Sequence, residues 1–212
     1  MYTLFIQKKR GDNSPFPLTR QLHDFLVHTQ ANGIFFAPGH LSKDAGMVKM
    51  LIDDLLDRTN IQKFGIGNRF GNNYIYAYEN YLNAMHKLWR VNRNNKSDHR
   101  KMVFVFRYTN SLPDLNGGTV KDIIRQIEIL GVAIGSSNFS YQTYGPIGGT
   151  GRTADKGEAD IFMFFDKSFK GKVIEQCPNA MESSMVLSES LTTVTPDFLK
   201  RMFEETLEHI LQ

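Results

Sequence analysis

Residues 131–140 read Gly-Val-Ala-Ile-Gly-Ser-Ser-Asn-Phe-Ser and carry more information than any other part of this chain. The apolar run at 132–134 is too short for a helix and predicts a buried strand. The glycine and small polar residues that follow predict a turn with hydroxyl groups, a carboxamide and backbone N–H groups. In an open α/β sheet, ligands bind at the carboxyl ends of strands. We therefore expect a ligand site at this strand end.

A second strand-like run, residues 102–106, comes directly after His99-Arg100-Lys101. Side chains alternate along an extended chain, so His99 and Lys101 are expected on the same side of that strand. The pattern thus places a nucleophile or base and a fixed cation at one spot.

Together, the two segments resemble the phospholipase D superfamily, whose sites pair a His-x-Lys strand with a Gly-Ser-x-Asn strand. The resemblance extends over residues 33–165. The family also has an aspartate five residues after the lysine, where this chain has Phe106. That departure resembles the branch that includes restriction-type nucleases, in which a later glutamate completes the site. Glu158, just before the apolar run 161–165, stands where such a glutamate is needed.

The resemblance implies a metal-independent phosphodiesterase or nuclease without a cofactor. His99 would attack phosphorus and form a phosphohistidine. Lys101 and Asn138 would hold the non-bridging oxygens, and Glu158 would fix the tautomer of His99. The chain has one copy of the motif, whereas the mechanism needs a second histidine. By analogy with single-motif members, we expect a homodimer with the site on its two-fold axis.

The formal net charge is only +3, but the basic residues are unevenly distributed. Six lysines and arginines lie in residues 87–101, against the single acid Asp98. Such a stripe beside a phosphate site favours a nucleic-acid partner, DNA or alternatively RNA. The alternative is a solvated helix end, where cations meet the helix dipole. The residues expected to contact substrate are Ser136, Ser137, Arg93, Lys96, Arg100 and Arg152.

A chain of 212 residues with 41% hydrophobic residues can form one well-packed domain, and we expect a single phospholipase D-like nuclease domain over residues 1–212. Strands that alternate with helices predict an α/β fold, with a mixed sheet flanked by helices on both faces. No secretory signal and no membrane-spanning run is evident, and Cys177 is the only cysteine. We therefore expect a cytoplasmic protein without a membrane partner.

Local patterns predict the individual elements. Strands are expected at 2–7, 34–37, 63–67, 102–106, 132–134 and 161–165. Helices are expected at 22–29 with a stop at Gly33, at 47–56 with Ser42 as cap, at 74–88, at 119–130 capped by Thr119, and from 196 to 210. Residues 171–194 show no clear pattern. His23 and His28 are off metal-ligand spacing and are expected on the surface.

Two other functions compete with the nuclease. A nucleic-acid-binding module could keep the phosphate pocket without the chemistry, and the absent aspartate at Phe106 supports that alternative. A phospholipid phosphodiesterase is the third, although no amphipathic helix with a basic face is evident.

Overall fold

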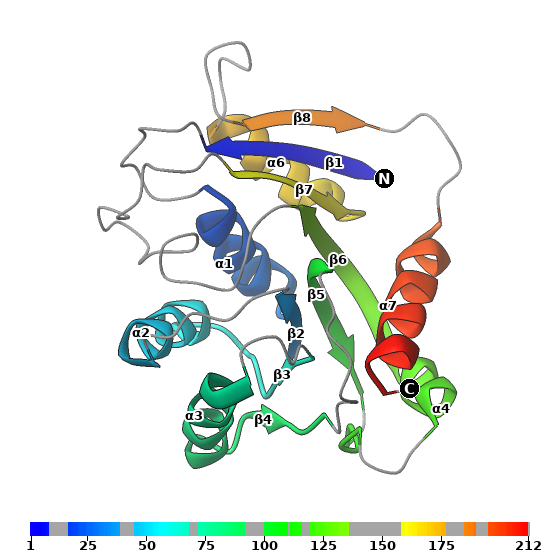
Figure 1. Ribbon diagram of the computed structural model, residues 1–212. Coiled ribbons are helices and arrows are strands. Elements are labelled where there is room, and N and C mark those ends of the chain that lie inside the picture. The colour runs from blue at the N-terminus through cyan, green and yellow to red at the C-terminus, as the bar shows by residue number, and fades with distance from the viewer. Residues whose placement is uncertain are drawn as a thin grey trace.

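One mixed β-sheet runs through the molecule (Figure 1). The computed structural model describes residues 1–8, 17–38, 45–67, 72–91, 100–109, 111–115, 119–135, 158–176, 185–189 and 195–211. Within these ranges, eight strands form the sheet in the order β4-β3-β2-β5-β6-β7-β1-β8. Strands β2, β3 and β4 pair in parallel, and the other neighbouring strands of this sheet pair antiparallel. The predicted α/β class with a mixed sheet is therefore confirmed.

The strands are short to medium in length. Their bounds are β1 (Tyr2–Lys8), β2 (Gly33–Pro38), β3 (Lys63–Ile66), β4 (Leu88–Trp89), β5 (Lys101–Tyr108), β6 (Ile127–Gly135), β7 (Glu158–Phe164) and β8 (Met185–Glu189).

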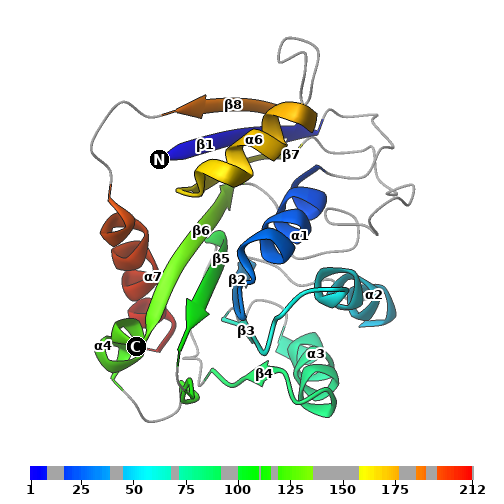
Figure 2. The same ribbon diagram turned by 180° about the vertical axis from the view of Figure 1, so that it is seen from behind.

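Helices cover both faces of the sheet, as predicted. Their bounds are α1 (Pro17–Thr29), α2 (Ala45–Leu56), α3 (Asn72–Ala84), α4 (Val120–Arg125), α6 (Lys167–Gln176) and α7 (Pro196–Leu211). Helix α7 lies on the face seen in Figure 1, and α1 and α6 lie on the face seen in Figure 2.

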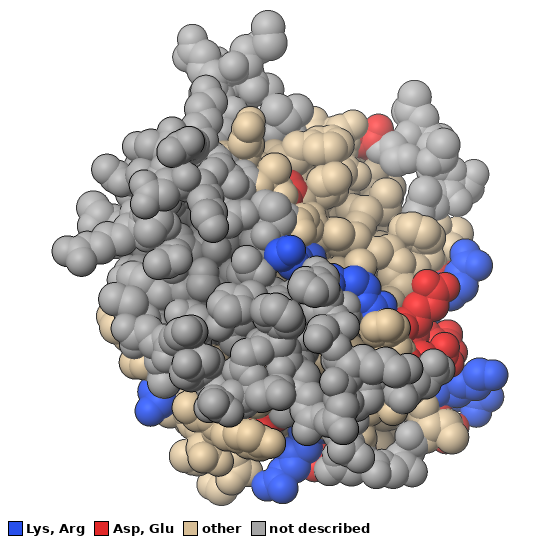
Figure 3. Space-filling view, viewed as in Figure 1, with Lys and Arg blue, Asp and Glu red and all other residues tan. Residues whose placement is uncertain are grey.

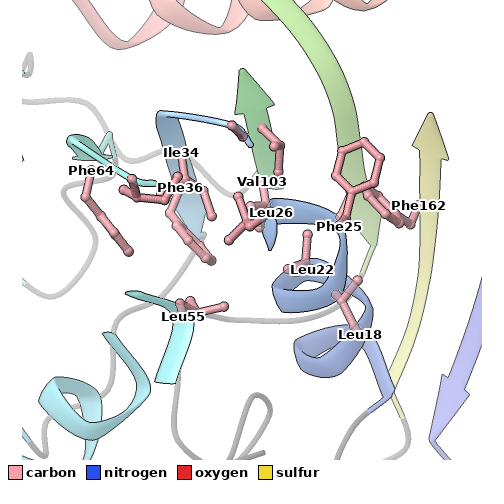
Figure 4. Packing of buried hydrophobic residues seen from close by; sticks show 14 of the residues in the cluster. Leu18, Leu22, Phe25, Leu26, Ile34, Phe36, Leu55, Phe64, Val103 and Phe162 are labelled. Atoms are coloured by element: carbon pink, nitrogen blue, oxygen red, sulfur yellow. The ribbon is translucent and has the colours of Figure 1, made fainter. Parts of the chain in front are cut away.

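The first core lies between the sheet and helices α1, α2, α3 and α6. Helix α1 contributes its apolar residues at helical spacing, because a stripe with that spacing faces one side of the helix. Phe25 of α1 packs edge-on against Phe162 of β7, with ring centroids 5.0 Å apart. Figure 4 shows α1 between the side chains of β2 and β3 on one side and β7 on the other, with labels on Leu18, Leu22, Phe25, Leu26, Ile34, Phe36, Leu55, Phe64, Val103 and Phe162.

The second core fills the opposite face, beneath α4 and α7. Phe203 of α7 is its centre, with ring centroids 4.6 Å from Phe104, 5.5 Å from Phe35 and 5.8 Å from Phe106. The predicted inward face of this last helix is confirmed, since Leu199, Phe203, Leu207 and Ile210 are all buried.

Two predicted helices are shorter than expected. Thr119 does cap α4, and its hydroxyl accepts a hydrogen bond from the N–H of Asp122. However, the helix ends at Arg125, and the residues from Ile127 onward belong to β6. Likewise, α3 ends at Ala84, and Leu88 belongs to β4. His86, between that helix and strand, has a φ of 57°, which ends the helical course of the chain.

The predicted stop at Gly33 is wrong. Helix α1 ends at Thr29, and Gln30 takes the left-handed conformation with a φ of 52°. Gly33 instead begins β2, where it pairs with Phe106. Helix α6 and strand β8 fall wholly or partly in the stretch without a predicted pattern. Ser42, the predicted cap of α2, lies outside the described residues.

Candidate functional site

Four strands meet at one end of the sheet, and this end holds the candidate site. Strand β5 begins there at Lys101, which pairs with Pro38, the last residue of β2. Strand β6 ends there at Gly135, which pairs with Asp160 of β7. Strand β7 begins there at Glu158. Because β5, β6 and β7 are antiparallel neighbours, the start of β5 lies beside the end of β6, and the end of β6 lies beside the start of β7.

The predicted motif residues continue from these strand ends in the sequence. His99 comes two residues before Lys101, and Ser136 comes directly after Gly135. Neither His99 nor the segment 136–138 lies within the described residues, and the same holds for Arg93, Lys96 and Arg152. The structure thus brings together the strand ends from which the two motifs depart, and Glu158 begins the next strand.

The strand ends also share a face of the sheet. Met102 pairs with Ile134, so Lys101 and Gly135 come one residue further along on their two strands. Near this end of the sheet, every second residue of β5, β6 and β7 faces the first core. Lys101, Gly135 and Asp160 are in phase with these core residues and lie on the face that α1 covers. The core residues in question are Val103, Val105, Ala133, Phe162 and Phe164.

Lys101 and Arg100 are the predicted site residues whose side chains the structure describes. Both are half-buried, Lys101 as the first residue of β5 and Arg100 just before it. Glu158 is placed by its strand position, where it pairs with Lys8 of β1.

Asp160 is a buried acid that the sequence interpretation did not select. Its side chain is 4% exposed, and it faces the same side as Lys101. The carboxylate lies directly over Gly135, because a Cβ on that glycine would be 2.0 Å from Oδ1 of Asp160. Any side chain at 135 would therefore displace the acid. The sequence does contain a signal for its burial, because Asp160 continues the alternation of the apolar residues Phe162 and Phe164 along the strand.

The position of the missing family aspartate is buried in the opposite core. Phe106 is fully buried and contacts Trp89, with ring centroids 5.4 Å apart, as well as Phe203. Lys101 faces the first core, whereas Phe106 belongs to the second. A side chain at position 106 therefore does not face the candidate site.

Within the described part of the basic segment, residues 87–91 and 100–101, two of the cations lie away from the candidate site. Leu88 of β4 pairs with Phe64 of β3, so Lys87 lies beside Lys63. Lys63 in turn pairs with Gly33 of β2, and Gly33 pairs with Phe106 of β5. At about 3.3 Å per residue, this row lies roughly 16 Å along β5 from Lys101. The ammonium group of Lys87 donates to the carbonyl of Ile61. Lys87 thus has a structural role far from the candidate site.

Arg90 is similarly engaged, because its guanidinium donates to Oδ1 of Asn83 at 3.1 Å. Charges of both signs intermingle on the side of the molecule where α7 and α4 lie (Figure 3). On that view, the described cations do not gather into one patch.

Among the helices within the described ranges, none is both long and apolar enough to span a membrane. The same residues contain no group of three or more His, Cys, Asp or Glu side chains that could hold a metal ion.

Among known proteins, matches to this chain are found only in solved structures. No family model matches the chain, and no curated protein matches it. Yeast tyrosyl-DNA phosphodiesterase is a structural neighbour at 12% identity and a TM-score of 0.42, with 76% of this chain and 46% of that chain covered. Two mutant forms of the same yeast enzyme give TM-scores of 0.41 at 10% and 12% identity, covering 76% and 78% of this chain and 46% and 48% of theirs. The chain thus spans about half the length of these structures.

Proposed function

We propose that the protein is a phospholipase D-like phosphodiesterase that hydrolyses DNA without a metal ion, possessing a site shared by two subunits of a homodimer. The observation that carries the proposal is the meeting of three strand ends on one face of the sheet. These are the start of β5 at Lys101, the end of β6 at Gly135 and the start of β7 at Glu158. The proposed chemical groups continue from these ends in the sequence.

The chemistry proceeds in two displacement steps. A ring nitrogen of His99 attacks phosphorus, forming an N–P bond while the P–O bond to the leaving group breaks. The histidine of the second subunit gives its proton to the leaving oxygen. Water then attacks phosphorus, the N–P bond breaks, and that second histidine takes the proton of the water. Glu158 holds His99 in the tautomer that presents a free nitrogen pair to phosphorus.

Charge on the phosphoryl oxygens must be stabilised in both steps. Lys101 supplies the fixed positive charge, and Asn138 supplies a hydrogen-bond donor, assisted by Ser136 and Ser137. A half-buried lysine at a strand end suits this task, because the strand fixes its backbone and partial burial strengthens its field. Removing one preorganised donor of this kind typically costs about 10²–10³ in rate.

Nucleic acid is the proposed substrate because basic residues flank the site in the sequence. Arg93, Lys96, Arg100 and Arg152 are the proposed contacts to the substrate backbone, with DNA as the first choice and RNA as the alternative. We further propose a restriction-type endonuclease role and a cytoplasmic location, the latter because a single cysteine suits a reducing compartment.

The competing function is a binding module that has lost catalysis, which the absent aspartate suggested. The placement of Phe106 weakens that argument. Since position 106 faces the second core, an aspartate there would not contribute a group on the Lys101 face of the sheet. The substitution therefore removes no group from that face.

The test is hydrolysis in the presence of EDTA. Purified wild type and His99→Ala are incubated with plasmid DNA and with bis(p-nitrophenyl) phosphate. Glu128→Gln serves as a matched surface control, because Glu128 lies near the opposite end of β6, paired with Arg107. We expect turnover by wild type and Glu128→Gln but not by His99→Ala. Retention of DNA in a gel shift without any turnover would support the binding module instead.

A further inference from the structure

The buried carboxylate of Asp160 lies in the same cross-strand row as the proposed phosphate-binding lysine. From β5 to β1, this row contains Lys101, Gly135, Asp160 and Ile6. Two strand spacings separate Lys101 from Asp160, which is about 10 Å between their backbones. The residue between them is a glycine, so no side chain stands between the cation and the acid on this face.

A carboxylate in this position is costly for the fold. Asp160 is 4% exposed, and a buried carboxylate must be stabilised by hydrogen bonds or opposite charge from the protein. Its neighbours along β7 on the same face are Phe162 and Phe164, which belong to the first core. An apolar side chain would continue that pattern, so packing alone does not account for an acid at the strand end. A buried acid of this kind is rare in a protein core unless it has a partner.

Gly135 leaves the space that the carboxylate of Asp160 occupies. Oδ1 of Asp160 occupies the space of a Cβ at position 135, and Gly135 directly precedes the Ser136 of the motif. The acid thus lies over the last paired residue of β6, the glycine that opens the Gly-Ser-x-Asn motif in the sequence.

We propose that Asp160 is a positioning residue of the phosphodiesterase site, acting as the buried counter-charge that orders its cationic and hydrogen-bond-donating groups. This inference rests on the proposed function. It has a distinctive consequence, because a negative charge near a phosphate site opposes anion binding while it fixes the groups that act on the anion. Removal of the charge should strengthen phosphate binding and weaken turnover.

The variant Asp160→Asn separates these two effects, because it removes the charge and keeps the shape. For an anion bound beside Lys101, whose backbone is about 10 Å from that of Asp160, loss of the unit charge at an effective dielectric constant of about 20 should tighten binding about tenfold. The turnover number should fall about 10²-fold, as expected when reacting groups lose their alignment. A residue that only supports the fold would instead weaken both binding and turnover.

Two controls match the variant. Phe162→Leu alters packing on the same strand and face without a change of charge, and should leave phosphate affinity unchanged. Glu128→Gln removes one negative charge near the far end of β6, where Glu128 pairs with Arg107 of β5. It should likewise leave the affinity unchanged. If Asp160→Asn fails to fold, as judged by circular dichroism, the smaller neutral variant Asp160→Ser takes its place.

The measurements are calorimetric titration with inorganic phosphate and steady-state hydrolysis of bis(p-nitrophenyl) phosphate. Tighter phosphate binding with a lower turnover number in Asp160→Asn supports the inference. Unchanged or weaker phosphate binding overturns it, even if wild type is active. If wild type binds phosphate but does not hydrolyse the diester, the proposed hydrolase is wrong, and the titration alone judges the counter-charge. If wild type does not bind phosphate, both proposals fail.

Discussion

The ring of Phe106 fills the space that a side chain at Gly33 would need. A Cβ on Gly33 would lie 2.0 Å from Cε2 of Phe106, its partner across β2 and β5. The first residue of β2 is therefore a glycine because of a ring from the neighbouring strand.

Gly33→Ala should accordingly destabilise the protein. The added methyl group forces the Phe106 ring out of its packed position, and overpacking of this kind typically costs about 1–3 kcal/mol. The measurement is the free energy of unfolding in urea. Gly171→Ala is the matched control, because a Cβ there meets no atom within 4 Å and alanine favours the helix. We expect that control to be neutral or stabilising by up to about 1 kcal/mol. Equal losses in the two variants would contradict the role of the ring.

Phe106→Asp should not improve the enzyme, although it restores the residue type of the family motif. The aspartate would be buried among Trp89, Phe203 and the rest of the second core, where an isolated carboxylate is strongly disfavoured. We expect loss of cooperative unfolding, measured by urea titration with circular dichroism. Phe106→Leu, which keeps an apolar side chain, should remain folded. A folded, more active Phe106→Asp would show that position 106 belongs to the site.

The amino-terminal cap of α6 should make stability depend on pH. Burial alone would raise the pKa of Asp166, but hydrogen bonds from the Ser168 hydroxyl and the Phe169 N–H, and the neighbouring His28, lower it below 3.8 overall. A carboxyl with a lowered pKa in the folded state stabilises the protein at neutral pH. That contribution is lost as the pH falls through the folded pKa.

Asp166→Asn tests this dependence. At pH 7 the variant should be about 0.3–1 kcal/mol less stable than wild type, because asparagine can still accept the hydrogen bond from the Phe169 N–H and only the charge is lost. The difference should narrow below about pH 4 as the wild-type carboxyl is protonated. Urea unfolding between pH 7 and pH 3 gives the measurement. Asp57→Asn, at an exposed acid, should stay within about 0.5 kcal/mol of wild type. A difference independent of pH would contradict the assignment to the carboxylate.

The shared site can be tested by mixing subunits. Wild-type and His99→Ala chains are unfolded together and refolded in equal amounts, and hydrolysis is compared with wild type at the same total concentration. If each site needs a histidine from both subunits, only wild-type pairs are active, and activity falls to about a quarter. Independent sites would retain about half. Size-exclusion chromatography of each preparation verifies that the pairs have formed.

The sequence alone predicts those strands and helices whose residue pattern fits only one type of element. The strands around residues 34–37 and 102–106 are short apolar runs bounded by breakers, and Thr119 and Pro196 mark helix starts by their own chemistry. The end of α4 could not be found in this way. Ile127 and Leu130 continue the helical spacing of Ile123 and Ile124, but Ile127 and Ile129 fit the alternation of a strand equally well.

Features that depend on the pairing of distant strands cannot be predicted from local sequence patterns. That Asp160 faces Lys101 across Gly135 follows from the antiparallel order of β5, β6 and β7, which no single segment specifies. For the same reason, the sequence places Lys87 close to the motif, whereas the sheet places it near the other end of β5. His28 was expected on the surface, but its side chain is 16% exposed and its Nε2 lies 2.8 Å from the Ser168 hydroxyl of α6.

The position of β1 has a consequence for folding during synthesis. This strand is made before the other seven strands of the sheet, but it lies between β7 and β8, and Lys8 pairs with Glu158. Leu4 and Ile6 therefore leave the ribosome long before the chain that will cover them exists. Pairing between such distant segments is slow and exposes an apolar strand edge in the meantime. Strand β1 is therefore protected from aggregation only after the carboxyl-terminal third of the chain has been synthesised.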